Sequence, residues 1–223
     1  MRARRLVLLV LLVLAVLLAA PAARAAAPAL PETGPLLALR AGFGVPQGSI
    51  ARAGPDVSDV VARKVPLGFE LGYRLGRRVW GELQFEIAPA TAASALCAAG
   101  TSCSASDVRF GLALQLRLLP DRRIDPWIGV GAGVEVMNAE GLDAATATRT
   151  EWSWAGLELP FVEAGVDVAV SREVAVGPWA SVGFGRFTSE SMRANGGDTV
   201  SGAVHGRATH RWLTAGLRAT LKL

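Results

Sequence analysis

Eight segments of the chain alternate apolar residues with glycine, small or charged residues at a period of two. From Val65 to Leu75, for example, every second residue is apolar, and the residues between are proline, glycine, glutamate or arginine. This period belongs to β-strands whose two faces meet different surroundings. Most segments are about as long as the 9–11 residues that a tilted strand needs to cross a bilayer. The eight segments span residues 37–44, 65–75, 79–87, 108–118, 128–136, 161–170, 174–185 and 212–223.

The connections between these segments alternate in length. Short turns lie at 76–78, around 121–125 and at 171–173, whereas the other four connections have roughly 15–20 residues. Short periplasmic turns and longer external loops are typical of outer-membrane barrels. The sequence therefore predicts an all-β fold, an eight-stranded antiparallel up-and-down transmembrane β-barrel with both chain ends on the periplasmic side.

The N-terminus has the features of a secretory signal peptide. Three arginines within the first five residues precede an unbroken apolar run at 6–20, and Ala23-Arg24-Ala25 offers small residues to a leader peptidase. The run is short for a helix that crosses the hydrocarbon, which needs about 20 residues. We predict a cleaved signal peptide at 1–25, a short N-terminal linker at 26–35 and the barrel at 36–223. An uncleaved anchor is the alternative for the first segment.

The formal net charge of +4 comes from this N-terminal segment. Four of the 23 basic residues and none of the 19 acidic residues lie in it, so the rest of the chain holds 19 of each sign. Binding to nucleic acid needs basic residues in excess, because they must neutralise phosphates. We therefore expect no nucleic-acid partner.

Charged residues inside the predicted strands share the face opposite the aliphatic one. A lipid-facing arginine or lysine costs about 2–4 kcal/mol at the bilayer midplane, so we place the aliphatic face against lipid and the charged face in the lumen. Glu158, Arg186 and Arg211 depart from this pattern, and we expect them among headgroups at the outer ends. The predicted lumen residues are six anions and six cations: Arg40, Glu70, Arg74, Glu82, Glu86, Arg109, Arg117, Glu135, Glu163, Asp167, Arg218 and Lys222.

Equal numbers of opposite charges predict paired networks in the lumen. The interior of an eight-stranded barrel is about filled by side chains, so such networks would plug it. A narrow ion path is the alternative reading of the same residues. A pair that loses one partner would leave a buried charge, at a cost of about 3–5 kcal/mol.

A secreted, water-soluble barrel of the lipocalin type would alternate in the same way, with its charged face outward. The scarcity of lysine argues against this soluble barrel, because a water-facing surface is expected to carry lysines and the chain has only Lys64 and Lys222. Glycine also disfavours it, because glycine weakens a strand and a water-facing surface has no need of it. The charged face carries glycines at 42, 44, 68, 72, 111, 129, 131, 133, 165, 177, 183, 185 and 216.

Two segments carry a family resemblance. Residues 126–134, PWIGVGAGV, and 177–185, GPWASVGFG, look like strands of the small outer-membrane β-barrel family of Gram-negative bacteria, which includes OmpA- and OmpX-like proteins. The resemblance spans about residues 36–223. It implies a place in the outer membrane and contact with outer-membrane lipid and lipopolysaccharide. It also implies recognition of the C-terminal strand by the barrel-insertion machinery, although this strand ends in Leu223 where family members commonly end in an aromatic residue.

Cys97 and Cys103 are the only cysteines, and both lie in the second long connection. Two cysteines this close in an oxidising compartment predict a disulfide. A metal site would need further ligands, and none is near. We therefore expect no metal and no cofactor.

His205 and His210 are the only histidines, and both precede the last strand. Lipid-modifying enzymes of the PagL or PagP type use a histidine, a serine and a carboxylate on this architecture. Such groups are close in sequence here, and they could support base-assisted nucleophilic attack. No motif fixes their geometry, so we expect solvated loop histidines and no catalytic residues. The candidate partners are Ser189, Glu190, Ser191 and Ser201.

These patterns favour a non-enzymatic protein with a structural or surface-interaction role. The barrel would serve as a platform, and its external loops would contact a possible extracellular ligand. The alternatives are an outer-membrane lipid-modifying enzyme and a narrow channel.

Overall fold

The computed structural model describes residues 32–97, 101–120, 122–143 and 146–223. The predicted signal peptide and most of the predicted linker lie outside these residues, and the first strand begins within that linker, at Gly34. No helix in the described part of the chain is long and apolar enough to cross a membrane. Its elements are β1 (Gly34–Gly48), α2 (Val57–Val60), β2 (Val61–Lys64), β3 (Leu67–Arg74), β4 (Val79–Ala92), β5 (Thr101–Arg117), β6 (Ile124–Asp143), β7 (Thr148–Ala169), β8 (Val174–Ala194), β9 (Val200–Ala203) and β10 (His210–Lys222).

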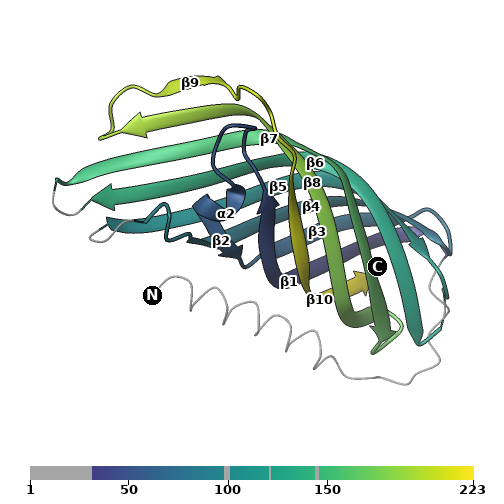
Figure 1. The fold of residues 1–223 in the computed structure, drawn as a ribbon. Coiled ribbons are helices and arrows are strands. Elements are labelled where there is room, and N and C mark those ends of the chain that lie inside the picture. The colour runs from purple at the N-terminus through teal and green to yellow at the C-terminus, as the bar shows by residue number, and fades with distance from the viewer. Residues whose placement is uncertain (1–31, 98–100, 121, 144–145) are drawn as a thin grey trace.

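Eight of the described strands close into a ring of antiparallel neighbours (Figure 1). Their order is β1, β3, β4, β5, β6, β7, β8 and β10, and β10 pairs again with β1. β2 continues the wall between β1 and β4, and β9 pairs with the outer part of β8. The eight-stranded up-and-down barrel predicted from the alternation is confirmed.

The seam between β1 and β10 closes the ring. Its register runs from Leu36 opposite Lys222 to Gly48 opposite His210, and it places Gly42 opposite Gly216. A Cβ on Gly216 would overlap the carbonyl oxygen of the residue before Gly42. Two glycines therefore allow the closing strands to approach each other at this point.

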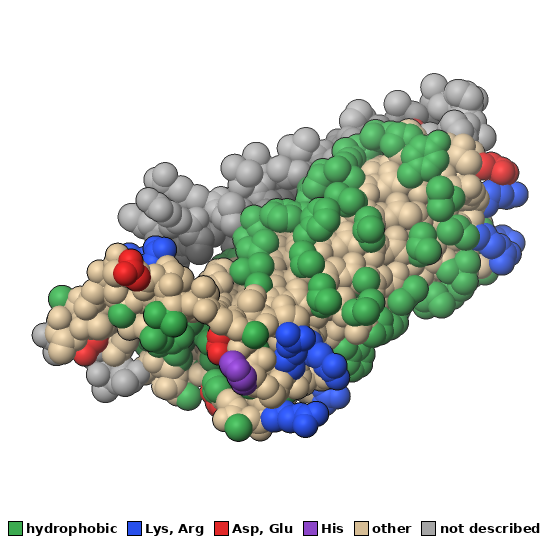
Figure 2. Space-filling model, turned by 90° about the horizontal axis from the view of Figure 1, so that it is seen from above, with side chains coloured by type: hydrophobic (Ala, Val, Ile, Leu, Met, Phe, Trp, Pro, Cys, Tyr) green, Lys and Arg blue, Asp and Glu red, His purple; other side chains and the backbone are tan. Residues whose placement is uncertain are grey.

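Large apolar side chains cover the outside of the ring (Figure 2). Leu71, Leu114, Val130 and Leu217 lie on four different strands and are 47–55% exposed. A continuous exposed apolar surface is unfavourable in water, and it matches the lipid-facing band of a membrane barrel. We call this surface the apolar belt.

Four strands run at least seven residues past the ends that the alternation predicted, into what we call the outer extension: residues 101–107, 137–143, 148–155 and 187–194, with β9. The expectation of a long loop between β6 and β7 was wrong, because only residues 144–147 separate them. The reason is a reversal of polarity. Beyond the belt, Met137 and Ala139 are buried on the inward face, while Asn138 between them faces outward. The period of two continues, but its apolar and polar sides exchange.

An apolar cluster fills the space inside the outer extension, and we call it the apolar cap. The connection between β1 and β3 contributes through α2, the inward face of the extension contributes its apolar residues, and the connection before β10 contributes one valine. A hydrogen bond from the Asp56 N–H to Asp59 Oδ2, at 2.9 Å, holds the start of α2. The buried members are Ile50, Val57, Val60, Val61, Met137, Ala139, Trp154, Phe187, Val204 and Trp212.

An irregularity in β7 overturns the expectation for Glu158. The pairing register of β7 with β8 shifts between Glu158 and Phe161. The shift turns Glu158 into the lumen, where it is 2% exposed and pairs with Arg109. The unbroken alternation of the sequence predicted an outward position for this carboxylate, among headgroups. That prediction was wrong because the alternation of inward and outward residues does not hold across a β-bulge. Arg186 and Arg211 are both exposed; Arg186 lies within β8, eight residues before its end, and Arg211 is the second residue of β10. Their place among headgroups stays a prediction.

Candidate functional site

Arg218 of β10 lies in the middle of the lumen network. Its guanidinium lies 2.7 Å from Glu70 Oε2, 2.6 Å from Glu82 Oε1 and 3.7 Å from Asp167 Oδ2. The side chains of Arg218, Glu70 and Glu82 are fully buried. One cation thus ties carboxylates from the neighbouring strands β3 and β4 to a carboxylate from β7, across the ring.

Arg40 of β1 makes a second bridge across the lumen. Its Nε lies 2.7 Å from Glu70 Oε1, and its Nη1 lies 2.8 Å from Glu163 Oε2 on β7. Gln84 accepts a hydrogen bond from Arg40 at 3.0 Å and donates one to Glu163 at 3.0 Å. Gln115 donates to Glu82 at 2.6 Å, so neutral side chains complete the network.

A third group lies toward the short turns. Arg117 pairs with Asp125 at 2.9 Å and with Asp167 at 2.8 Å. Arg74 donates a hydrogen bond to the carbonyl oxygen of the last residue at 3.0 Å. The Lys222 ammonium lies 5.5 Å from the ring centre of Trp80.

A fourth group lies toward the outer extension. Lys64 of β2 pairs with Glu86 at 2.9 Å and with Asp107 at 2.5 Å. Arg109 pairs with Glu158 and lies 3.7 Å from Glu86. Charge-assisted contacts of this kind hold side chains from β2, β4, β5 and β7 together.

Four tryptophans line the lumen, each under a cation. Arg117 lies 4.1 Å above Trp80, and Lys64 lies 4.3 Å above Trp212. The other two pairs are Arg40 with Trp179 at 4.5 Å and Arg218 with Trp127 at 4.9 Å. Cation–π contacts strengthen when water is excluded, so these rings stabilise the cations as well as filling space.

His210 was expected to be a solvated loop residue, and this was wrong. It begins β10, is 1% exposed and stacks on Phe187 at 4.3 Å between ring centres. Its Nε2 lies 2.8 Å from Glu135 Oε2, and Trp212 donates to Glu135 Oε1 at 2.6 Å. The antiparallel pairing of β10 with β8 makes His210 part of the barrel wall, opposite Gly185. The closeness of His210 to serines in the sequence gave no indication of this pairing. His205 is exposed.

The structure brings the predicted lumen residues together on one inner face, most of them in ion pairs or hydrogen bonds across strands. Sequence reasoning missed Lys64, Asp107 and Asp125, and misplaced Glu158 and His210. Lys64 and Asp107 continue the same alternation as the predicted lumen charges, but they lie one residue before the predicted strands, which begin at 65 and 108. Extending each strand by a few residues of unchanged parity would have found both.

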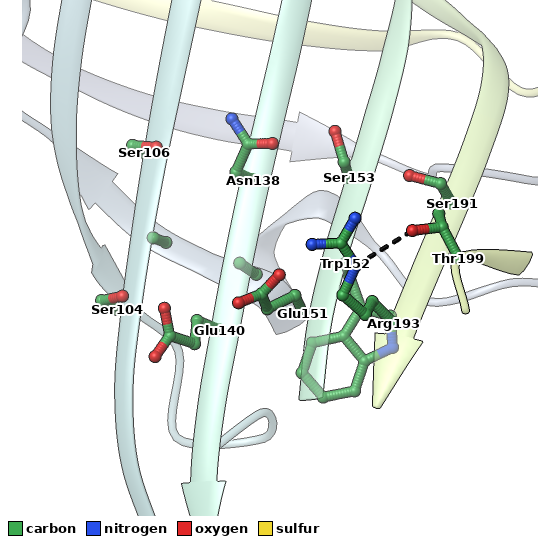
Figure 3. A pocket seen from close by; sticks show the side chains of 12 residues that line it. Ser104, Ser106, Asn138, Glu140, Glu151, Trp152, Ser153, Ser191, Arg193 and Thr199 are labelled. Carbon is green, nitrogen blue, oxygen red and sulfur yellow. Dashed lines mark hydrogen bonds between the residues drawn. The ribbon is translucent and has the colours of Figure 1, made fainter. Parts of the chain in front are cut away.

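The outer face of the extension carries a groove of about 360 Å³ (Figure 3). Side chains of neighbouring strands form two rows across it, Ser106–Asn138–Ser153–Ser191 and Ser104–Glu140–Glu151–Arg193. Arg149 lies 2.8 Å from Glu140 and 2.9 Å from Glu151, so these two glutamates share a cation. Arg193 donates to Thr199 at 3.0 Å and closes one side of the groove. The groove offers hydroxyl, amide, carboxylate and guanidinium groups.

The predicted disulfide is present near the end of the outer extension. It joins Cys97 and Cys103, whose Cα atoms are 5.8 Å apart. Closing so short a ring contributes roughly 2–3 kcal/mol in the chain-entropy model, which is enough to shape one connection. No group of three or more histidine, cysteine or acidic residues in the described ranges could hold a metal ion.

Known proteins resemble the chain in structure. No family model and no curated protein matches its sequence. A major outer membrane protein from Thermus thermophilus matches the structure with a TM-score of 0.59 and 13% identity, over 85% of this chain and 100% of the other. The chain has the fold of an outer-membrane β-barrel. The fold that the family resemblance implied is thus confirmed.

Two further outer-membrane proteins are similar to the chain at low identity. Neisserial surface protein A has a TM-score of 0.48 and 14% identity, over 84% of this chain and 97% of the other. OprG from Pseudomonas aeruginosa has a TM-score of 0.48 and 12% identity, over 86% of this chain and 98% of the other.

Proposed function

We propose that this chain is a non-enzymatic protein of the outer membrane, with a lumen closed to ions and an outer extension that contacts molecules at the cell surface. The fold and the apolar belt support the location. Export by the signal peptide at 1–25 and insertion through the C-terminal strand belong to the same proposal. Lipopolysaccharide and extracellular ligands are the partners that the outer groove and the exposed outer ends would meet.

The combination of paired charges and the apolar cap is the observation that best supports a lumen closed to ions. Arg218, Glu70 and Glu82 are fully buried and contact one another. An ion that passed this level would have to separate such pairs, and an uncompensated buried charge costs about 3–5 kcal/mol. Toward the outer end it would also meet the cap, which is built from buried apolar side chains.

Conductance measurements test the closed lumen. We expect the purified protein, inserted into planar bilayers, to give no step conductance above the background of the detergent alone. The control is the variant Arg40→Ser, Arg218→Ser, which removes two of the large cations from the same level and should raise the frequency of openings. Reproducible ohmic steps from the unmodified protein would establish the narrow-channel alternative instead.

Cysteine labelling tests the orientation and the accessibility of the groove. In a Cys97→Ser, Cys103→Ser background, we expect Ser153→Cys to react with a membrane-impermeant maleimide on intact cells. Arg172→Cys, on a short turn, should react only after the outer membrane is permeabilised. Labelling of Arg172→Cys on intact cells, with Ser153→Cys protected, would reverse the orientation and remove the groove from the cell surface.

The environment of His210 supports the non-enzymatic part of the proposal. His210 is held by Glu135 and Phe187 beneath the cap rather than at a surface that a lipid could reach. Its place opposite Gly185 puts it on a different part of β8 from Ser189 and Ser191, which pair with β9. The geometry therefore favours a structural role for this histidine.

A further inference from the structure

A pocket of about 330 Å³ lies at the opposite end of the barrel from the groove. It is formed where the turn between β3 and β4 meets the turn between β5 and β6, and we call it the turn-end pocket. Three arginines and three apolar residues line it: Arg77, Arg78, Leu118, Leu119, Pro120 and Arg122.

A backbone hydrogen bond links the first turn to the end of β5, because the Arg117 N–H donates to the Arg78 carbonyl oxygen at 2.7 Å. The second turn is closed by a hydrogen bond of its own, from the Arg122 N–H to the Leu119 carbonyl oxygen at 3.2 Å. Asp125 accepts from the Leu119 N–H at 3.1 Å and pairs with Arg117 at 2.9 Å. This carboxylate is engaged on the lumen side, where it stabilises the turn.

The pocket straddles the edge of the apolar belt. Leu118 and Leu119 are 43% and 52% exposed; Leu118 continues the row of lipid-facing side chains that includes Leu116, and Leu119 follows it in the turn. Arg77, Arg78 and Arg122 are exposed just beyond that row. One wall of the pocket is therefore apolar and the other is cationic, at the level where hydrocarbon gives way to headgroups.

The three short turns at this end carry more basic than acidic residues. Five arginines lie in the three short turns, at 77, 78, 122, 123 and 172, against two acidic residues, Asp121 and Glu173. Arg77 lies 3.7 Å from Glu32, but both side chains are more than half exposed, and such a contact is weak in solvent. Guanidinium groups bind phosphate oxygens through paired hydrogen bonds, which makes arginine well suited to phosphate recognition.

We propose that the turn-end pocket binds the headgroup phosphate of an anionic phospholipid in the periplasmic leaflet of the outer membrane. The guanidinium groups of Arg77, Arg78 and Arg122 contact the phosphate, and Leu118 and Leu119 contact the glycerol and the first acyl carbons. Each basic residue at a membrane surface adds to the attraction for anionic lipid, so three arginines give a clear preference over zwitterionic lipid. This site rests on the proposed orientation, which the labelling experiment tests separately.

Native mass spectrometry of the detergent-solubilised protein tests the site. We expect phosphatidylglycerol to bind with a dissociation constant at least about tenfold lower than that of phosphatidylcholine at low salt, because each pocket arginine adds to the attraction. The variant Arg77→Gln, Arg78→Gln, Arg122→Gln should lose this preference. The matched control Arg186→Gln, Arg207→Gln, Arg211→Gln removes the same charge at the other end of the barrel and should keep it.

Three outcomes would overturn the proposal. The first is equal binding of the two lipids by the unmodified protein, and the second is an unchanged preference in the turn-end variant. The third is competition by soluble glycerol phosphate at the same concentration as the lipid, because the apolar wall would then add nothing and the site would bind free phosphate. Heat-modifiable gel mobility of each variant shows that the comparison is made between folded barrels.

Discussion

Replacing Arg218 by methionine should lower the free energy of unfolding by about 3–5 kcal/mol, because the change leaves buried carboxylates without their cation. Glu70 and Glu82 have fully buried side chains and lie 2.7 and 2.6 Å from the Arg218 guanidinium. Urea unfolding in phospholipid vesicles, followed by tryptophan fluorescence, measures the loss.

Two further variants show whether the loss is electrostatic. Glu82→Gln combined with Arg218→Met removes one charge of each sign and should recover a large part of the stability. Arg211→Gln removes an exposed arginine of the same strand and should change the unfolding free energy by less than about 0.5 kcal/mol. A loss below about 1 kcal/mol for Arg218→Met would mean that water reaches these carboxylates, and the closed lumen would be wrong.

Gly216→Val should impair closure of the barrel. The added Cβ overlaps the backbone of β1 across the seam, and β10 cannot move away because the same residue pairs with Trp179 of β8. Overpacking costs about 1–3 kcal/mol, and more where backbone must shift. We expect a smaller folded fraction after refolding into detergent micelles, measured as the heat-modifiable band on a gel.

The neighbouring residue provides the control for this change. Leu217 faces lipid and is 53% exposed, so Leu217→Val should leave the folded fraction nearly unchanged. Gly216→Ala should give an intermediate effect, since its single methyl group is the smallest addition. Equal folded fractions for all three variants would show that the seam can widen, and that its paired glycines have another purpose.

The sequence predicted the ring of strands because lipid imposes a strict rule on one face. Within the belt every outward residue must be apolar, so Leu112, Leu114 and Leu116 mark β5 without ambiguity. Beyond the belt that rule ends. β5 continues there with Ser104 and Ser106 on its outward face. A sequence pattern that requires apolar residues on the outward face interprets such polar residues as a loop.

The lumen was predicted in part for a related reason. Alternation with the apolar residues of the belt predicted inward positions for Arg40, Glu82 and Arg218. The structure places these side chains in contact with other lumen residues. Parity could not give Glu158, because a bulge lies between it and the belt. The apolar cap was not predicted either, because α2 and the connection around it have no period that indicates where they fold.

The unbroken course of β6 from Ile124 to Asp143 fixes the height of the groove above the apolar belt. Val134 is the last strongly exposed apolar residue of this strand before Asn138 enters the groove. Four residues of a tilted strand rise roughly 10 Å. In the proposed orientation, the groove is therefore held, without a hinge, beside the innermost sugars of the leaflet rather than in open medium. A large soluble partner would have to reach down through the saccharide layer, whereas a molecule already lying in that layer would meet the groove sideways.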